Sequence, residues 1–418
     1  MKLRSASLYY AIIVALIIAL TCSAFISFIY FQLYEEQYYD LHNRLVSEVY
    51  SGIELSKSNS FQTGESARWQ FSSVHNDSIE IKKIKWGIYD VVYCKAYFKK
   101  NHFEKSMLLG SKEKQQYSKI ALYISNQQKA INIAGSIKIR GDVYLASNGF
   151  KRNYIDIRTP IATDYLKGNI LLSNNALYSI DQTEFNNIIR QKNINSNDSI
   201  VESTYLLNHS IYQSFSNNTI VIKSENDIHL SNIALQGNIK IICSKTVIID
   251  KNTNIKDICI IAKHVIIRKD AELNAQFMIS DSMRLEEHVT LNYPSSILLL
   301  DENSISISSR KLTIAKNCNI KGEIYFLNTH KKLTNESYCL IEEGSKIEGL
   351  LYSDVNTSIY GEVYGTAFID KPIVILNGAY YENQLLNATF DKSKLNTSFL
   401  WSPLLQSNTE KTTLKCLD

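Results

Sequence analysis

The sequence predicts a mainly β protein: an N-terminal transmembrane helix, then a small strand-rich region, then a triangular parallel β-helix of about 18 residues per coil. Three observations predict this fold. The chain begins with a long apolar run, residues 241–291 repeat with a period of six, and charged residues recur with a period of 18. A lone strand repeats every second residue and an amphipathic helix about every 3.6, so neither explains a period of six.

The apolar run at residues 8–34 contains no charged side chain and exceeds the roughly 20 residues needed to cross a bilayer. Lys2 and Arg4 precede it, and Glu35 follows it. The positive-inside rule then gives a single-pass protein with a cytoplasmic N-terminus and the bulk of the chain in the periplasm or outside the cell. A cleaved signal peptide, with small residues near Ala24, is the alternative.

The chain divides into five predicted segments. In chain order they are an anchor with a short cytoplasmic head, a helical stem, a strand-rich region, the β-helix and a C-terminal cap or tail, at 1–34, 35–60, 61–130, 131–378 and 379–418. Apolar residues of the stem stand at helical steps. The six-residue period fails at 149–218, which we expect to loop out as an insertion carrying a short helix capped by Thr183. Trp401 and Leu404 are expected to cover an open end of the β-helix.

Two interleaved series carry the six-residue period. One runs in steps of six from Cys243 to Leu291, the other from Ile241 to Val289, and Thr253 is their one polar member. A double apolar step every six residues describes short strands joined by corners with one face inward. Charged residues 18 apart indicate that three such sides make one coil, and they are Asp250, Arg268 and Glu286.

The sequence offers no pattern typical of catalysis. The seven cysteines are scattered without a Cys-x-x-Cys, and Cys243, Cys259 and Cys318 fall at inward positions, which favours core packing over a disulfide or metal site. The histidines between 229 and 288 do not share a register. We therefore assign no catalytic residue, no cofactor and no metal site. The net charge of +4 without a basic block predicts no nucleic-acid partner.

A second motif, Ile-x-Gly-x-apolar-Tyr, recurs four times, at 139–144, 320–325, 347–352 and 359–364. In these repeats, over 131–145 and 220–375, the chain resembles bactofilins, the polymer-forming cytoskeletal proteins of bacteria. The resemblance implies a triangular coil with three short strands per turn, and self-association. The N-terminal helix resembles those of minor type IV pilins and pseudopilins, which implies packing into a filament.

The tyrosines of the motif are expected to point outward and form an interaction surface, and they are Tyr144, Tyr325, Tyr352 and Tyr364. The sequence thus predicts a structural or assembly protein of a bacterial cell envelope. Its partners would be the lipid bilayer, through residues 8–34, and other proteins or further copies of itself. A pilin-like subunit and a polysaccharide-binding or carbohydrate-active β-helix are the alternatives.

Overall fold

The structure, a computed structural model, is strand-rich and carries one long apolar N-terminal helix. It describes residues 5–58, 61–69, 77–153, 164–207, 210–300, 309–328, 337–406 and 409–417. The chain forms two compact units. The first contains Met1–Leu55, Ser66–Ile81 and Cys94–Lys105, and the second contains Ser56–Glu65, Lys82–Tyr93 and Ser106–Asp418.

The first unit is built on helix α1 (Ser5–Lys57), which includes both the predicted anchor and the predicted stem. Its apolar N-terminal window is long enough to cross a membrane and is not buried, which fits either a membrane span or a signal sequence. Further along the helix, Leu45, Val49 and Ile53 are buried at spacings of four residues. A Cβ on Gly52 would lie 2.5 Å from Ile79 Cδ1, so glycine permits the close approach of helix and strand.

A cluster of three ionisable side chains, Arg44, Glu48 and Asp77, lies at this helix in the first unit. The guanidinium of Arg44 binds both carboxylate oxygens of Asp77, with Nε 2.6 Å from Oδ2. Burial, and then the negative charge of Asp77, raise the pKa of Glu48 to about 7, although Arg44 opposes the shift. Glu48 therefore holds a proton near neutral pH that an exposed glutamate would have released.

Four strands follow the helix and contribute residues to the two units. They are β1 (Ser66–Trp69), β2 (Ser78–Trp86), β3 (Tyr89–Phe98) and β4 (Asn101–Ser111). Within the second unit, β29 (Lys411–Cys416) pairs antiparallel with β4. The first turn of the second unit after these strands is η1 (Gln115–Tyr117).

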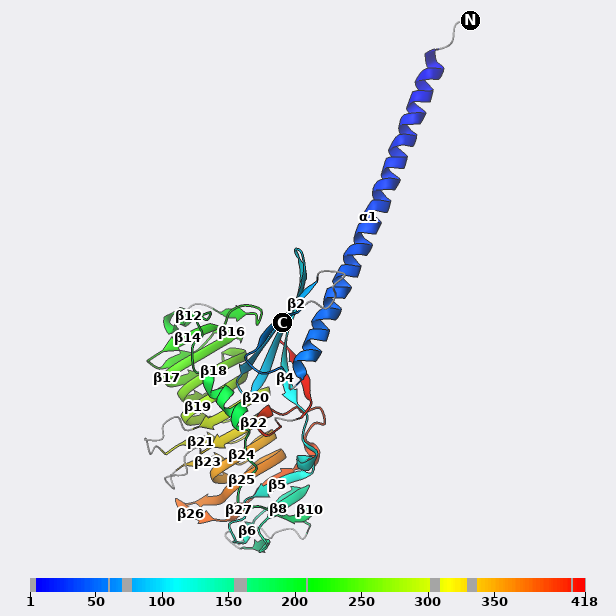
Figure 1. Cartoon of the computed structure of the whole chain (residues 1–418). Helices are drawn as coiled ribbons and strands as arrows, with labels where there is room; N and C mark the ends of the chain where they lie inside the picture. Colours follow the sequence, from blue (N-terminus) through cyan, green and yellow to red (C-terminus); the bar gives the residue numbers. More distant parts are fainter. Residues whose placement is uncertain are drawn as a thin grey trace. The chain divides into compact units, whose positions relative to one another are not determined.

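Most of the second unit consists of parallel strands that are hydrogen-bonded one after another, and we name this part the parallel stack (Figure 1). Its strands are β5 (Ile120–Ile124), β7 (Lys138–Arg140), β8 (Asp142–Leu145), β10 (Leu166–Lys167), β11 (Ile170–Leu172), β12 (Ser199–Glu202), β13 (Ile211–Gln213), β14 (Ile220–Ser224), β15 (Ile228–Leu230), β16 (Ala234–Gly237), β17 (Ile239–Ile249), β18 (Asn254–Ile267), β19 (Glu272–Leu285), β20 (Thr290–Leu300), β21 (Lys311–Ile314), β22 (Asn319–Leu327), β23 (Tyr338–Ile341), β24 (Lys346–Ile359), β25 (Glu362–Leu376) and β28 (Thr389–Asp391).

Three smaller groups of elements complete the second unit. A parallel three-stranded sheet contains β27 (Gln384–Leu386), β6 (Ile131–Ala134) and β9 (Phe150–Arg152). Strand β26 (Ala379–Glu382) forms an antiparallel hairpin with β25. The helical elements are α2 (Gln182–Arg190), η2 (Ser203–Leu207), η3 (Lys392–Lys394) and α3 (Pro403–Gln406).

The order of strands in the stack differs from their order in the chain. From β12 to β25 the strands follow the sequence, and β25 then pairs in parallel with both β5 and β28. Strand β5 pairs with β8, which in turn pairs with β11. The coils of residues 120–172 therefore lie beyond β25, and residues 173–198 link the two ends of the stack.

The stretch expected to loop out as an insertion contributes strands to the stack. Strands β10 and β11 pair with β7 and β8, and β12 and β13 pair with β14 and β16. The six-residue period fails here because these strands are short and most of their side chains are exposed. The expected helix forms as α2, but its N-cap is Asp181, whose carboxylate accepts a hydrogen bond from the backbone N–H of Glu184 at 2.9 Å. Residues 154–163 lie outside the described residues.

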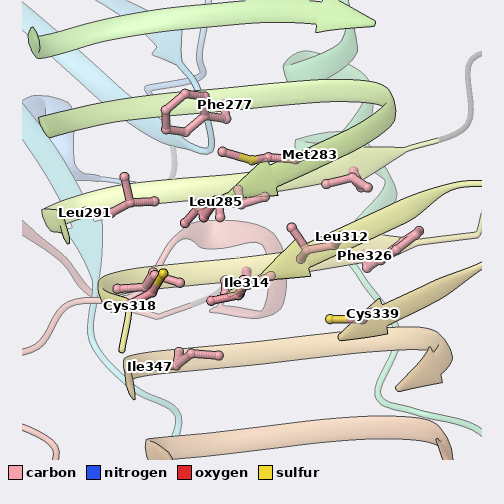
Figure 2. Close-up of a cluster of buried hydrophobic side chains, with 14 of the residues drawn as sticks. Phe277, Met283, Leu285, Leu291, Leu312, Ile314, Cys318, Phe326, Cys339 and Ile347 are labelled. Atoms are coloured by element: carbon pink, nitrogen blue, oxygen red, sulfur yellow. The ribbon is translucent and has the colours of Figure 1, made fainter. Parts of the chain in front are cut away.

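Every member of the two six-residue series is buried, Thr253 included. The predicted spacing of 18 also appears in the register, where Val247 pairs with Val265 and Leu273 pairs with Leu291. We call each level of strands in the stack a rung. Figure 2 shows side chains of successive rungs, among them Phe277 and Leu291, gathered in the interior between the strands. These mostly aliphatic side chains form the inner core.

A second hydrophobic core lies on the flank of the stack, and two residues of the six-residue series belong to it. Cys259 and Ile261 pack there, whereas Ile258 and Ile260 point into the inner core. The inward assignment of Cys259 and Ile261 is therefore wrong. The reason is a register shift at Asp257, a residue with φ of 62°, which exchanges the two faces of β18.

Glycines stack on one another in successive strands of the parallel stack. Gly322, Gly349 and Gly365 are register partners on β22, β24 and β25. Gly349 has φ of 146°, and a Cβ there would lie 2.0 Å from the carbonyl oxygen of Gly322. The glycines of two motif copies, Gly322 and Gly349, thus allow successive backbones to approach closely, whereas the row continues through Gly365 and not through Gly361 of the last copy.

We expect Gly349→Ala to lower the free energy of unfolding by about 2–4 kcal/mol, because the added methyl group meets a backbone atom that cannot move. Chemical denaturation checks this value. Gly378→Ala is the matched control, since Gly378 also has a positive φ but a Cβ there would have no atom within 4 Å. Equal losses in the two variants would contradict a steric role for the stacked glycines.

Stability of the first unit should fall with rising pH because of Glu48. Its pKa is about 7 in the folded chain against 4.5 when exposed. The folded state keeps a proton that the unfolded state releases, so this stabilisation is complete below about pH 4.5 and lost as pH rises through about 7. Amide exchange in residues 40–57, corrected for intrinsic rates, should be slower at pH 6 than at pH 8. Glu48→Gln should remove the difference and Glu54→Gln, on the exposed face, should retain it.

Candidate functional site

The tyrosines of the repeated motif belong to a ladder of aromatic rings on the flank of the stack. Register partners place Tyr325 beside Tyr352, Tyr352 beside Phe368, Phe368 beside Tyr123, and Tyr123 beside Tyr144. Neighbouring ring centroids are 5.5–6.1 Å apart. Because each of these aromatic residues pairs with the aromatic residue of the next rung, their rings form a continuous row.

Other segments of the second unit cover this row. Tyr178, in the link between the two ends of the stack, contacts the rings of Tyr123 and Phe368, and its carbonyl oxygen accepts a hydrogen bond from Tyr352 Oη at 3.0 Å. Tyr325 is fully buried and Tyr352 is 6% exposed, while Tyr144 is half-buried. The expectation that Tyr325 and Tyr352 offer an exposed interaction surface is therefore wrong.

Tyr364, the fourth predicted residue, lies apart from the ladder and is half-buried. Its register partner is Glu348, its hydroxyl donates to the carboxylate of Glu362, and the ammonium of Lys394 lies 4.1 Å from its ring centroid. The motif thus places tyrosines in two different surroundings. The last copy begins 12 residues after the third, whereas the register pairs Ile347 with Val363, which is 16 residues later, so Tyr364 does not align with Tyr352.

A buried carboxylate, Glu323, lies next to the aromatic ladder. It accepts hydrogen bonds from Tyr325 Oη at 2.7 Å, Tyr89 Oη at 3.1 Å and Ser402 Oγ at 2.7 Å, and from the backbone N–H of Ser402. Burial raises the pKa of Glu323, and these four donors only moderate the shift. The carboxylate thus binds the C-terminal segment, through Ser402, and the start of β3, through Tyr89, to the stack. Trp401 and Leu404, expected to cap an end, pack in this flank core instead.

Five charged side chains form a second buried polar cluster. Asp90 lies 2.8 Å from Lys85 Nζ and 2.9 Å from Lys411 Nζ, and Lys85 also binds Glu184 at 2.5 Å. Burial alone would raise the pKa of Asp90, but the nearby ammonium groups hold it well below its usual range. Burial lowers the pKa of Lys83 to about 8, and its ammonium donates to two backbone carbonyls. Paired charges of this kind join distant segments and are closed to a substrate.

No sequence signal could identify these polar clusters, because hydrogen-bonded members are separated by as many as 321 residues. Among the residues described, no three His, Cys, Asp or Glu side chains are grouped so that they could hold a metal ion. Cys243 and Cys318 are buried in the inner core as expected, and Cys339 lies there as well. Comparisons with protein-family models, with curated proteins and with solved structures find no match to this chain.

Among the described residues, exposed large apolar side chains of the second unit lie on the outermost strands and on the hairpin of β25 and β26. At one end, Ile170 and Leu172 of β11 are 49% and 72% exposed. At the other end, Ile200 of β12 and Tyr212 of β13 are 62% and 64% exposed. Terminal strands of a parallel stack are natural sites for adding a further strand. These two ends are the candidate interaction sites.

Replacing Glu323 tests the role of the buried carboxylate. Glu323→Ala should lower the free energy of unfolding by about 3 kcal/mol, because the hydroxyl groups of Tyr89, Tyr325 and Ser402 lose their common acceptor. Chemical denaturation measures the loss, and hydrogen exchange should rise in residues 395–405. Glu343→Ala, at an exposed position, should change neither quantity. Unchanged exchange in 395–405 for the Glu323 variant would contradict the proposed attachment.

Proposed function

We propose that the chain is a structural protein of a bacterial cell envelope, anchored in the inner membrane by α1, with a β-helix outside the cytoplasm that assembles end to end. The observation that supports it most is the apolar exposure at both ends of the parallel stack, at Leu172 and Ile200. Exposed apolar side chains beside the edge of a parallel sheet favour association with another sheet edge.

The coil geometry behind this proposal is a triangular β-helix, similar to that of the bactofilins. Three features support it: rungs repeating at about 18 residues, glycines in register, and a mostly aliphatic interior. A contact between the opposite ends of two identical chains is heterologous, and such contacts produce open filaments when they do not close into a ring.

The N-terminal helix would determine where in the cell the assembly lies. An apolar window that is exposed along its whole length requires a lipid or protein environment. The asymmetry between Lys2 and Arg4 before it and Glu35 after it favours a cytoplasmic N-terminus. A pilin-like subunit would use the same helix differently, by packing it against the helices of other subunits inside a filament.

The test uses the full chain in detergent, examined by electron microscopy and analytical ultracentrifugation over a range of concentrations. The wild-type chain should form filaments or concentration-dependent oligomers. Leu172→Asp and Ile200→Asp should each abolish them, since a charge cannot be buried unpaired at an apolar contact. Tyr381→Asp, on the exposed hairpin of β25 and β26 away from the terminal strands β11 and β12, should retain them. Oligomers that survive both end substitutions would contradict end-to-end assembly, and association that depends on residues 8–34 alone would favour the pilin-like role.

A further inference from the structure

A groove of about 510 Å³ lies on the side of the parallel stack, alongside β21, β23, β24 and β25. Its floor is a column of four register partners: Lys311 pairs with Tyr338, Tyr338 with Asn356, and Asn356 with Lys371. One residue from each of four successive strands therefore faces the groove, with a spacing of about 4.8 Å per rung. The groove runs along the axis of the stack.

The hairpin of β25 and β26 forms a wall of this groove. Tyr380 and Glu382 line it from β26, opposite Ile375 and Ile373 of β25. Tyr380 is 57% exposed, so the ring presents a face to solvent although it stands beside a polar floor. An exposed aromatic ring beside amide and charged groups is suited to stacking against the apolar face of a sugar ring while its hydroxyls are hydrogen-bonded.

The charge of the groove indicates which class of ligand it can bind. Within the described part of the chain, no carboxylate lies within 4.0 Å of the ammonium of Lys311 or Lys371, and Lys311 lies 5.6 Å from the ring centroid of Tyr338. Glu382 is partly neutralised by Lys129, whose ammonium is 3.9 Å away. The groove thus has an excess of positive charge at both ends of its floor, which attracts a ligand bearing carboxylates or phosphates.

We propose that this groove binds an acidic polysaccharide, which lies along the stack axis with its sugar rings against Tyr338 and Tyr380 and its acidic groups near Lys311 and Lys371. Asn356, between the two lysines, would hydrogen-bond the sugar hydroxyls. The volume of the groove lies within the range of about 300–1,000 Å³ found for ligand sites. The inference is independent of end-to-end assembly, because the groove uses none of the exposed residues of the terminal strands.

Binding is tested on the full chain in detergent by isothermal titration calorimetry. The probes are de-esterified oligogalacturonate, oligoalginate and hyaluronan oligosaccharides, and the matched neutral probe is fully methyl-esterified oligogalacturonate. Polyglutamate supplies negative charge without sugar rings. At least one acidic oligosaccharide should bind, with an affinity that falls as salt rises, while the esterified sugar and polyglutamate should bind at least about tenfold more weakly.

Variants locate the site. Lys371→Gln and Tyr380→Ala should each weaken binding of the acidic oligosaccharide about tenfold. Tyr381→Ala, on the opposite face of the same strand, and Lys251→Gln, an exposed lysine elsewhere on the stack, should leave it unchanged. All four positions are at least partly exposed, so the fold tolerates these changes. No binding of any acidic oligosaccharide at millimolar concentration, equal binding of polyglutamate, or equal effects of Tyr380→Ala and Tyr381→Ala would overturn the proposal.

Discussion

Backbone pairing between parallel rungs is the constraint on which the rest of the structure depends. It places each side chain against its register partner in the next coil, so one residue type repeated along the chain becomes a row. Three such rows result: mostly aliphatic residues inside, glycines such as Gly349 in successive strands, and aromatic rings from Tyr325 to Tyr144 on the flank. The first row provides apolar burial, the second permits close approach of the backbones, and the third provides a surface for other segments to cover.

The flank with the aromatic rings is covered by other segments because of the order of the rungs. Because the coils of residues 120–172 lie beyond β25, the chain must return along the stack in residues 173–198 before it begins β12. The returning link brings Tyr178 and α2 onto the aromatic rows, and Glu323 holds the C-terminal segment beside them. The flank is thereby closed. The terminal rungs and the side groove stay open, and the two functional proposals use them.

The sequence was sufficient to predict the features that depend on local periodicity. The long N-terminal helix, the strand-rich fold and the burial of the six-residue series all follow from apolar spacing. It could not predict features that depend on distant pairing. Cys259 changes face because of one irregular residue, Asp257; Tyr352 is buried by a segment 174 residues away; and Asp90 and Lys411 meet across most of the chain. The groove also escaped prediction, since its lysines, Lys311 and Lys371, are aligned only by the register of three intervening pairings.

The order of the rungs is the central claim, and a cysteine pair tests it directly. Ser125 follows β5 and donates from its backbone N–H to the carbonyl oxygen of Ile369, and its hydroxyl donates to Asp370. The double variant Ser125→Cys/Asp370→Cys should therefore form an intramolecular disulfide in dilute, detergent-solubilised chain, as measured by non-reducing electrophoresis and peptide mass spectrometry. Leu172→Cys/Ser199→Cys should not, because those residues lie on opposite terminal strands. An intramolecular bond in the second variant and none in the first would mean that the coils stack in the order of the sequence, and would contradict this account.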